Sequence, residues 1–300
     1  MAGLEKTNRK IFANSQFMMI QFFPSVQNRI IHFYSTITIH MLSQFREFFT
    51  WTPIYWGCSL AFPLFFSQYE TLANHFTGLC LGLTSVAMGQ VVTVGYYTFY
   101  NRFQWTKKYR DSIIQYAFQP EGFLVLGSYL SIYWISGSMP SSYYSPVGGI
   151  HWRHVALQLL FQDFLQYIMH RVEHIYSPLY RRLHQSHHRH VHPILLDAFD
   201  GSIGDTFFMI LVPLWITSRL VHTNVWSYMV FGTMYANMLT LIHSEVDHPW
   251  DCLAHYLGIG TPRDHRIHHT KMKRNYGHIF MYWDQLGSTY TVQEPIKKYT

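Results

Sequence analysis

Charged residues are scarce in this sequence. Asp, Glu, Lys and Arg make up 13% of the 300 residues, whereas aromatic residues make up 18%. Soluble domains usually carry about 25% charged residues, so the composition favours a membrane protein. The net charge of +6 comes from basic clusters at loop positions rather than from a continuous stripe. This distribution argues against nucleic acid as a partner.

Cysteines and cofactor-binding motifs are also few. The three cysteines, Cys58, Cys80 and Cys252, form no CxxC pair and two lie in apolar runs, so no disulfide framework is expected. No GxGxxG follows a strand pattern and no P-loop is present, so the chain has no nicotinamide or flavin domain of its own. The first 50 residues lack a short apolar region followed by a cleavage site, and we expect an interfacial segment there.

Histidine, by contrast, is abundant. The sequence has 20 histidines, and eight of them form three boxes, HxxxH, HxxHH and HxxHH: His170, His174, His184, His187, His188, His265, His268 and His269. Spacings of three and four residues place side chains on one face of a helix, about 5–6 Å apart. Each box is therefore expected to present its imidazoles toward one point. Eight nitrogen ligands are more than one metal ion needs, which predicts a site for two metals.

Other metal chemistries stay open at this point. Imidazole suits iron, zinc, copper and nickel alike, and a histidine-rich loop that binds only adventitious zinc is the simplest alternative. A zinc transporter or sensor usually places its ionisable ligands inside several spans, near the midplane. The boxes here lie at or beyond the ends of apolar segments, which favours an enzyme. A bis-histidine haem would leave the triplets unused.

Apolar segments predict an all-α, polytopic membrane protein. They cover about 51–67, 75–100, 119–137, 154–170, 206–221 and 225–242. Lys and Arg concentrate in 1–50, 101–110, 171–190 and 263–298, and are missing from 68–74 and 138–150. With six crossings and both termini cytosolic, every basic segment faces the cytosol. We therefore expect an N-terminal interfacial segment (1–50), motif-free spans (51–150) and a catalytic region (151–300), with a cytosolic histidine-rich helical lobe that caps the spans.

The three boxes, in this order, resemble the fatty acid hydroxylase/sterol desaturase superfamily of integral membrane oxygenases. PLYRRLHQSHH is similar to the superfamily's segment between boxes one and two. Residues 243–269, HSEVDHPWDCLAHYLGIGTPRDHRIHH, resemble the methylsterol oxidases, and residues 275–290, NYGHIFMYWDQLGSTY, resemble the closing segment. The resemblance covers roughly residues 155–292.

The resemblance implies a site with two non-haem irons held by the eight box histidines. It adds His243, which matches a further family histidine, and His248, which stands where methylsterol oxidases usually have an apolar residue. Asp163 lies two turns before His170 inside an apolar segment; it is expected either to orient a ligating imidazole or to make a helix-packing hydrogen bond. The remaining candidates are expected to be outer, loop or surface histidines: His190, His192, His255 and His278.

The implied activity is O₂-dependent hydroxylation or desaturation of a membrane lipid. A sterol-like lipid is the first choice, with fatty-acyl, sphingoid and terpenoid lipids as alternatives. Electrons are expected from NAD(P)H through an external reductase and a cytochrome b₅-type carrier, because no such domain is fused to the chain. The final KKYT, with Lys297 and Lys298, resembles the dilysine retrieval signal of endoplasmic-reticulum membrane proteins and predicts a cytosolic C-terminus.

Overall fold

The computed structural model describes residues 41–69, 75–100 and 124–292. In these ranges the regular elements are helices, and the only strand-like pairing is a bridge between Ile259 and Phe280. The predicted all-α fold is confirmed. The chain divides into residues 1–52 and residues 53–300; of the first unit, residues 41–52 are described and are helical. The other described residues, 53–69, 75–100 and 124–292, belong to the second unit.

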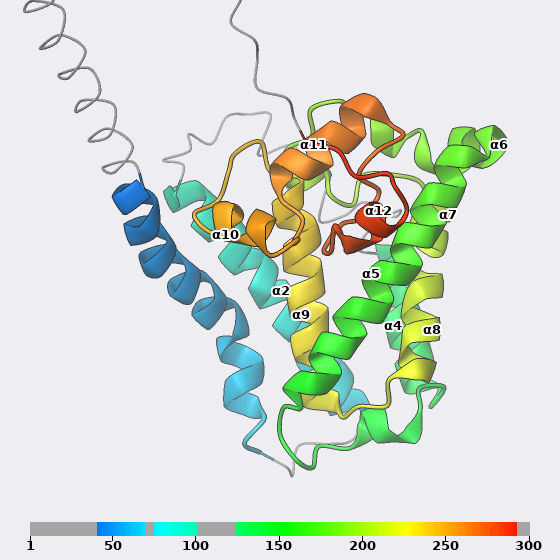
Figure 1. The fold of residues 1–300 in the computed structure, drawn as a ribbon. Helices are drawn as coiled ribbons and strands as arrows, with labels where there is room; N and C mark the ends of the chain where they lie inside the picture. The colour runs from blue at the N-terminus through cyan, green and yellow to red at the C-terminus, as the bar shows by residue number, and fades with distance from the viewer. Residues whose placement is uncertain (1–40, 70–74, 101–123, 293–300) are drawn as a thin grey trace, which may run out of the picture. The chain divides into compact units, whose positions relative to one another are not determined.

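Helices fill the apolar segments predicted from the sequence. Residues 53–66 are helical, followed by α2 (His75–Tyr100), α4 (Val125–Ile135), α5 (Trp152–Ile175), α8 (Val212–Leu220) and α9 (Val225–Ile242). Helix α9 packs against α2 on one side and α5 on the other, while α4 packs on α2 and α8 on α5 (Figure 1). The helical nature of these segments is confirmed.

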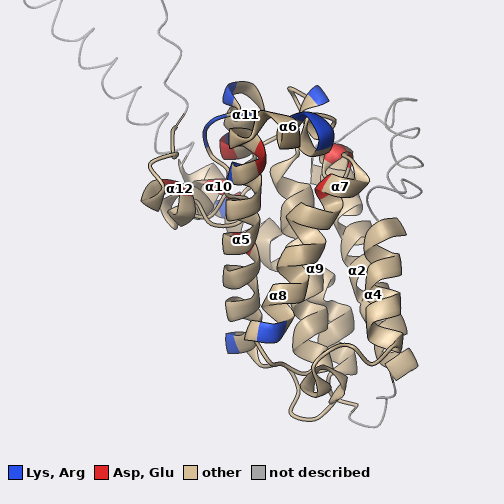
Figure 2. Ribbon diagram, turned by 90° about the vertical axis from the view of Figure 1, so that its right-hand side faces the viewer, with Lys and Arg blue, Asp and Glu red and all other residues tan. Residues whose placement is uncertain are grey.

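Charge is scarce along these helices, and Asp163 in the middle of α5 is an exception. Helices α2, α4 and α9 carry no Asp, Glu, Lys or Arg, and Figure 2 shows the charged residues gathered mainly at the end with α6, α7 and α11. Among the described residues, two helical stretches, 75–100 and 203–220, are long and apolar enough to cross a membrane. These features indicate membrane association.

Small and polar residues join α2 to α9. The hydroxyl groups of Ser85 and Thr233 lie 2.8 Å apart, and Gln90 Nε2 donates to Asn237 Oδ1 over 2.9 Å. A Cβ on Gly89 would lie 2.6 Å from the Thr233 methyl carbon, so glycine permits this close approach. Polar groups buried among apolar helices must pair with one another. These contacts make a close helix–helix face between α2 and α9.

The apolar segment near 206–221 is not one regular helix. It begins with α7 (Ile203–Thr206), widens into a π-turn, η7 (Phe207–Leu211), and continues as α8. Pro213 at the start of α8 has no N–H to bond to the carbonyl four residues earlier, which explains the wider turn.

Shorter elements gather at one end of the bundle (Figure 1). They are α6 (Ser177–Leu179), η4 (Tyr180–His184), η5 (His187–Arg189), η6 (Leu195–Asp197), α10 (Asp251–Tyr256), α11 (Pro262–Lys271) and α12 (Tyr282–Leu286). A 3₁₀ turn, η3 (Ser141–Tyr144), precedes α5. The predicted N-terminal segment up to residue 40, the basic loop at 101–110 and the dilysine pair lie outside the described residues.

Candidate metal centre

Helix α5 supplies the first histidine box. Its buried face repeats every three to four residues and carries Gln158, Gln162, Gln166 and His170. His174 follows one turn later, and the His170 and His174 ring centroids are 5.0 Å apart. The HxxxH box thus lies on a regular helix, as its spacing predicts.

The second box departs from the expected helix. His184 ends the π-turn η4, and His187 and His188 open the 3₁₀ turn η5. Gln185 N–H donates to the Tyr180 carbonyl five residues back over 2.8 Å. The Leu183 carbonyl, which an α-helix would pair with residue 187, accepts the Ser202 hydroxyl over 2.7 Å. These distant contacts replace the regular helical ladder.

The third box lies on α11, whose start is fixed by local sequence. Thr261 and Asp264 form a capping box: the Thr261 side chain accepts from Asp264 N–H, and Asp264 Oδ2 accepts from Thr261 N–H. Pro262 occupies the first helical position, where its missing N–H costs no hydrogen bond. The helix then carries His265, His268 and His269, all of them buried.

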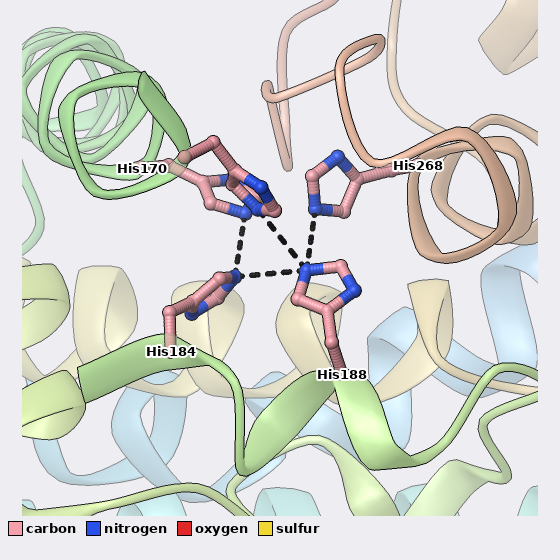
Figure 3. Close-up of side chains that lie close together, drawn as sticks. His170, His184, His188 and His268 are labelled. Carbon is pink, nitrogen blue, oxygen red and sulfur yellow. Dashed lines mark hydrogen bonds between the residues drawn. The ribbon is translucent and has the colours of Figure 1, made fainter. Parts of the chain in front are cut away.

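Nine histidines converge in two groups. The five-histidine cluster consists of His170, His174, His184, His188 and His268. The four-histidine cluster consists of His187, His243, His265 and His269. Figure 3 shows the rings of His170, His184, His188 and His268 facing one another across a small space.

Boxes two and three are each divided between the clusters. His184 and His188 belong to the five-histidine cluster and His187 to the other, while His265 and His269 belong to the four-histidine cluster and His268 to the other. Consecutive residues on a helix point about 100° apart, so an HH pair cannot face a single point. The expectation that each box presents its imidazoles toward one point is wrong for these two boxes, because each box contributes ligands to both clusters.

Within each cluster the Nε2 atoms lie at nearly constant spacing. In the five-histidine cluster, His188 Nε2 lies 3.0 Å from His184 Nε2, 3.1 Å from His174 Nε2 and 3.0 Å from His268 Nε2. In the four-histidine cluster, His243 Nε2 lies 2.9 Å from His265 Nε2 and 3.3 Å from His187 Nε2. Two nitrogens about 2.1 Å from one metal, at right angles, are about 3.0 Å apart.

In five of the nine histidines, the contacts of the opposite ring nitrogen explain why Nε2 faces inward. Nδ1 lies 2.7–3.0 Å from a backbone carbonyl oxygen in four cases: His170 with Tyr276, His187 with Asp200, His243 with Leu239 and His268 with Arg274. His184 Nδ1 lies 2.9 Å from Asp205 Oδ1, and the Glu173 carboxylate is 3.6 Å away. A carbonyl accepts only from an N–H, which puts the proton on Nδ1 and leaves a lone pair on Nε2.

Converging lone pairs repel unless a cation lies among them, so the donor set fits metal ions. Burial, together with neighbouring histidines, lowers the pKa of His265 and His268 well below 6.5. Both imidazoles are therefore neutral at physiological pH, the form that binds metals. Asp205, Glu173 and the carbonyl partners carry no spacing signal in the sequence; the position of Asp205 at the head of an apolar segment is the one available hint.

Asp163 does not contact a histidine of either cluster. Its carboxylate accepts from Ile279 N–H and Phe280 N–H, both over 2.8 Å, and from Trp283 Nε1–H over 3.0 Å. It therefore fastens the closing segment to α5. Of the two roles expected for Asp163, the packing hydrogen bond matches these contacts.

His248 lies apart from both clusters. Its Nδ1 is 3.2 Å from the Tyr96 hydroxyl, and its Nε2 is 3.0 Å from Ser244 Oγ. Both ring nitrogens have partners in the protein, and neither faces the other histidines. His248 is therefore left out of the ligand set proposed below.

The other histidines differ in position. His190 lies between Asp197 and Asp200, at 3.2 and 2.8 Å, while His192 and His255 are exposed. His278 is buried beside the clusters, with its ring centroid 4.9 Å from that of His170. It lines a small cavity together with His184, His187 and His243.

Comparison with known proteins identifies the family of this chain. The fatty acid hydroxylase family model matches residues 155–289. The chain is 46% identical to an alternative squalene epoxidase from Phaeodactylum tricornutum, over 76% of this chain and 71% of that protein. It is 30% identical to a Delta(7)-sterol 5(6)-desaturase of Gibberella zeae, over 46% of this chain and 38% of that protein.

A methylsterol monooxygenase of Aspergillus fumigatus is 26% identical, over 48% of this chain and 50% of that protein. No solved structure gives a significant match. These relatives are oxidoreductases that act on lipids. The chain belongs to the fatty acid hydroxylase family.

Proposed function

We propose that this chain is a di-iron oxygenase that adds one oxygen atom from O₂ across a double bond of a linear isoprenoid lipid such as squalene. The observation that carries the proposal is the pair of adjoining clusters with inward-facing Nε2 atoms. Nine histidines would hold the metals: His170, His174, His184, His188 and His268 at one, and His187, His243, His265 and His269 at the other.

Iron is favoured over zinc by the chemistry of the family. Zinc has no redox chemistry, whereas bound iron would supply the redox chemistry by which O₂, two external electrons and two protons give one oxygen atom to the lipid and one molecule of water. Nε2 spacings near 3.0 Å suit right-angled ligand pairs, which an octahedral ion accepts. The protein's own part is to fix imidazoles: four carbonyls and the Asp205 carboxylate hold Nδ1–H in five of the nine histidines, so these five rings do not rotate.

The substrate proposal rests on similarity that reaches beyond the histidine boxes. The 46% identity to the squalene epoxidase extends over 76% of the chain, whereas the family model covers only residues 155–289. Relatives that act on sterols match less than half of the chain, at 26–30% identity. A linear isoprenoid is one of the terpenoid lipids kept as alternatives in the sequence analysis.

Oxidation of a sterol-like lipid remains the second candidate. It is favoured by the HSEVDHPW stretch at residues 243–250 and by the sterol desaturase and methylsterol monooxygenase relatives. Both candidates use the same metal centre and differ in the bond that is oxidised. Neither the HSEVDHPW stretch nor these relatives favour a fatty-acyl or sphingoid lipid as the substrate.

Electrons would come from NAD(P)H through an external reductase and a cytochrome b₅-type carrier. Exposed basic residues surround the histidine lobe: Arg181, Arg182, Lys271, Lys273 and Arg274. An acidic carrier would be attracted to this surface, and turnover supported by it should weaken as salt increases. We place the enzyme in the endoplasmic-reticulum membrane with six crossings and both termini cytosolic, as the basic segments and the dilysine pair favour.

The deciding experiment uses purified full-length protein loaded with Fe(II). It receives squalene, ¹⁸O₂, NADPH, a reductase and cytochrome b₅, and products are identified by mass spectrometry. An epoxide with one ¹⁸O atom, which disappears in His187→Ala, supports the proposal. An oxidised sterol formed from a sterol substrate, with no epoxide from squalene, would favour the second candidate. Zinc that persists under iron-replete expression, without activity on either lipid, would overturn both.

A further inference from the structure

A second cavity lies among the helices of the bundle. Its walls come from α2, α4, α8 and α9, together with Phe199 and Ile210. Six lining residues belong to α2 and four to α4. All ten precede residue 155, where the family match begins. Residues 51–150, in which no motif is recognisable, therefore supply half of the residues that line this cavity.

The lining is almost entirely apolar. It contains no charged residue, and three side chains, Trp134, Tyr228 and Tyr235, have a polar tip. The Trp134 indole N–H donates to the His75 carbonyl over 2.6 Å, and the Tyr235 hydroxyl donates to Gln166 Oε1 over 2.8 Å. Two of the three polar tips are thus occupied within the protein. A ligand with a polar head group finds little to bind here, whereas a hydrocarbon chain does.

The apolar cavity meets the cavity at the histidine clusters. Phe199 and Ile210 line both. Tyr235 lines the apolar cavity, and its partner Gln166 lines the histidine cavity. The boundary between the two cavities therefore has an apolar side, formed by Phe199 and Ile210, and a hydrogen-bonded side, formed by Tyr235 and Gln166. These two apolar side chains separate a chain lying in the apolar cavity from the histidine cavity.

We propose that this cavity binds the hydrocarbon chain of a linear isoprenoid, with Phe199 and Ile210 as the passage to the histidine clusters. Helices α2 and α4 then select the substrate, although they lie outside the segment that defines the family. The class of hydrocarbon rests on the proposed function; the cavity and the two side chains that it shares with the histidine cavity do not.

Glycines in the lining offer a direct test. A Cβ added at Gly127 meets no heavy atom within 4 Å, and one added at Gly82 meets only Met229, at 3.8 Å. Both glycines line the cavity, and an added Cβ at either position meets no backbone atom, so we expect a leucine there to reduce the cavity volume. Gly95 on α2 also has nothing within 4 Å of an added Cβ, but it does not line the cavity. Leucine has a higher helix propensity than glycine, so the substitutions do not disfavour the helices.

The experiment measures binding of radiolabelled squalane to purified, iron-loaded full-length protein in detergent, with no electron donor added. Squalane is saturated and cannot be epoxidised, so binding is measured apart from catalysis. We expect Gly127→Leu and Gly82→Leu to weaken saturable binding by about tenfold or more, and Gly95→Leu to leave it unchanged. Equal binding by wild type and both cavity variants, with normal thermal stability, would overturn the cavity proposal.

The passage has its own variant and readout. Ile210→Phe narrows the boundary but leaves most of the apolar cavity intact, so squalane binding should persist while squalene oxidation falls. Loss of squalane binding in Ile210→Phe together with unchanged binding in Gly127→Leu would place the ligand elsewhere. If squalane binds as expected but no lipid is oxidised by the wild type, the proposed function fails and the cavity proposal stands.

Discussion

His187 and His188 are adjacent in the chain, yet they belong to different clusters. We expect His187→Ala to reduce iron from about two to about one per chain, because the five-histidine cluster keeps all its nitrogens. Turnover should be abolished rather than halved, since both irons act on one O₂. Iron analysis and an activity assay on the same preparation check this. His192→Ala, at an exposed position, is the matched control, and normal iron and activity in His187→Ala would contradict a two-metal centre.

Acid should release the metals and lower the stability of the fold over the same pH range. Burial lowers the pKa of His265 and His268 well below 6.5, so the unfolded chain takes up protons on these groups at a pH where the folded protein does not. Stability therefore falls as pH drops below about 6.5, by up to about 1.4 kcal/mol per pH unit for each such histidine. Bound iron and the melting temperature, measured between pH 7.5 and 5.5, should decrease together; an unchanged melting temperature would contradict this.

The sequence alone predicts the histidines well and their partners poorly. The eight box histidines and His243 all lie in the two clusters, because helical spacing acts locally. The Nδ1 acceptors are backbone carbonyls of Tyr276, Asp200, Leu239 and Arg274, which every residue possesses and no motif marks. His248 shares the histidine-rich context, but Tyr96 and Ser244 engage its ring, and only the packing of α2 reveals this.

At the scale of elements, the closing segment depends on α5. Asp163 accepts three N–H groups from residues 279, 280 and 283. Asp163→Asn replaces one acceptor oxygen with a donor that faces an N–H, and should cost about 1–3 kcal/mol of stability. Activity should fall mainly through this loosening, with iron content largely retained at low temperature. Thermal denaturation and iron analysis distinguish this from direct loss of a ligand; complete iron loss in a stable variant would assign Asp163 to the metal site.

Long apolar elements are predictable, whereas the second box is not. Helices α2, α5 and α9 follow from apolar runs that need no partner to be recognised. The π-turn and 3₁₀ turn that carry His184, His187 and His188 depend on Ser202, which bonds to the Leu183 carbonyl from 19 residues away. Such a contact exists only after folding, so local spacing suggested a regular helix instead.

At the scale of the whole molecule, the two ends of the helices differ in charge: most charged residues lie at the end with α6, α7 and α11 (Figure 2). If the histidine lobe faces the cytosol, the turn η3 lies on the opposite side. A glycosylation acceptor inserted near Ser142 should be modified in microsomes, and one inserted near Lys273 should remain unmodified. Cleavage by an endoglycosidase shows which insertion carries sugar. Modification near Lys273 alone would reverse the proposed orientation.

The division of the two HH pairs between clusters has a consequence for assembly. When one cluster fills, its ion immobilises two short backbone segments, and these same segments carry ligands of the other cluster. Binding of the first ion therefore includes the entropy cost of ordering the ligand segments of both clusters. The second ion does not have this cost and binds more tightly. Loading should be cooperative: at half-saturating iron, native mass spectrometry should find mostly empty and fully loaded chains. A dominant singly loaded species would show that the two clusters fill independently.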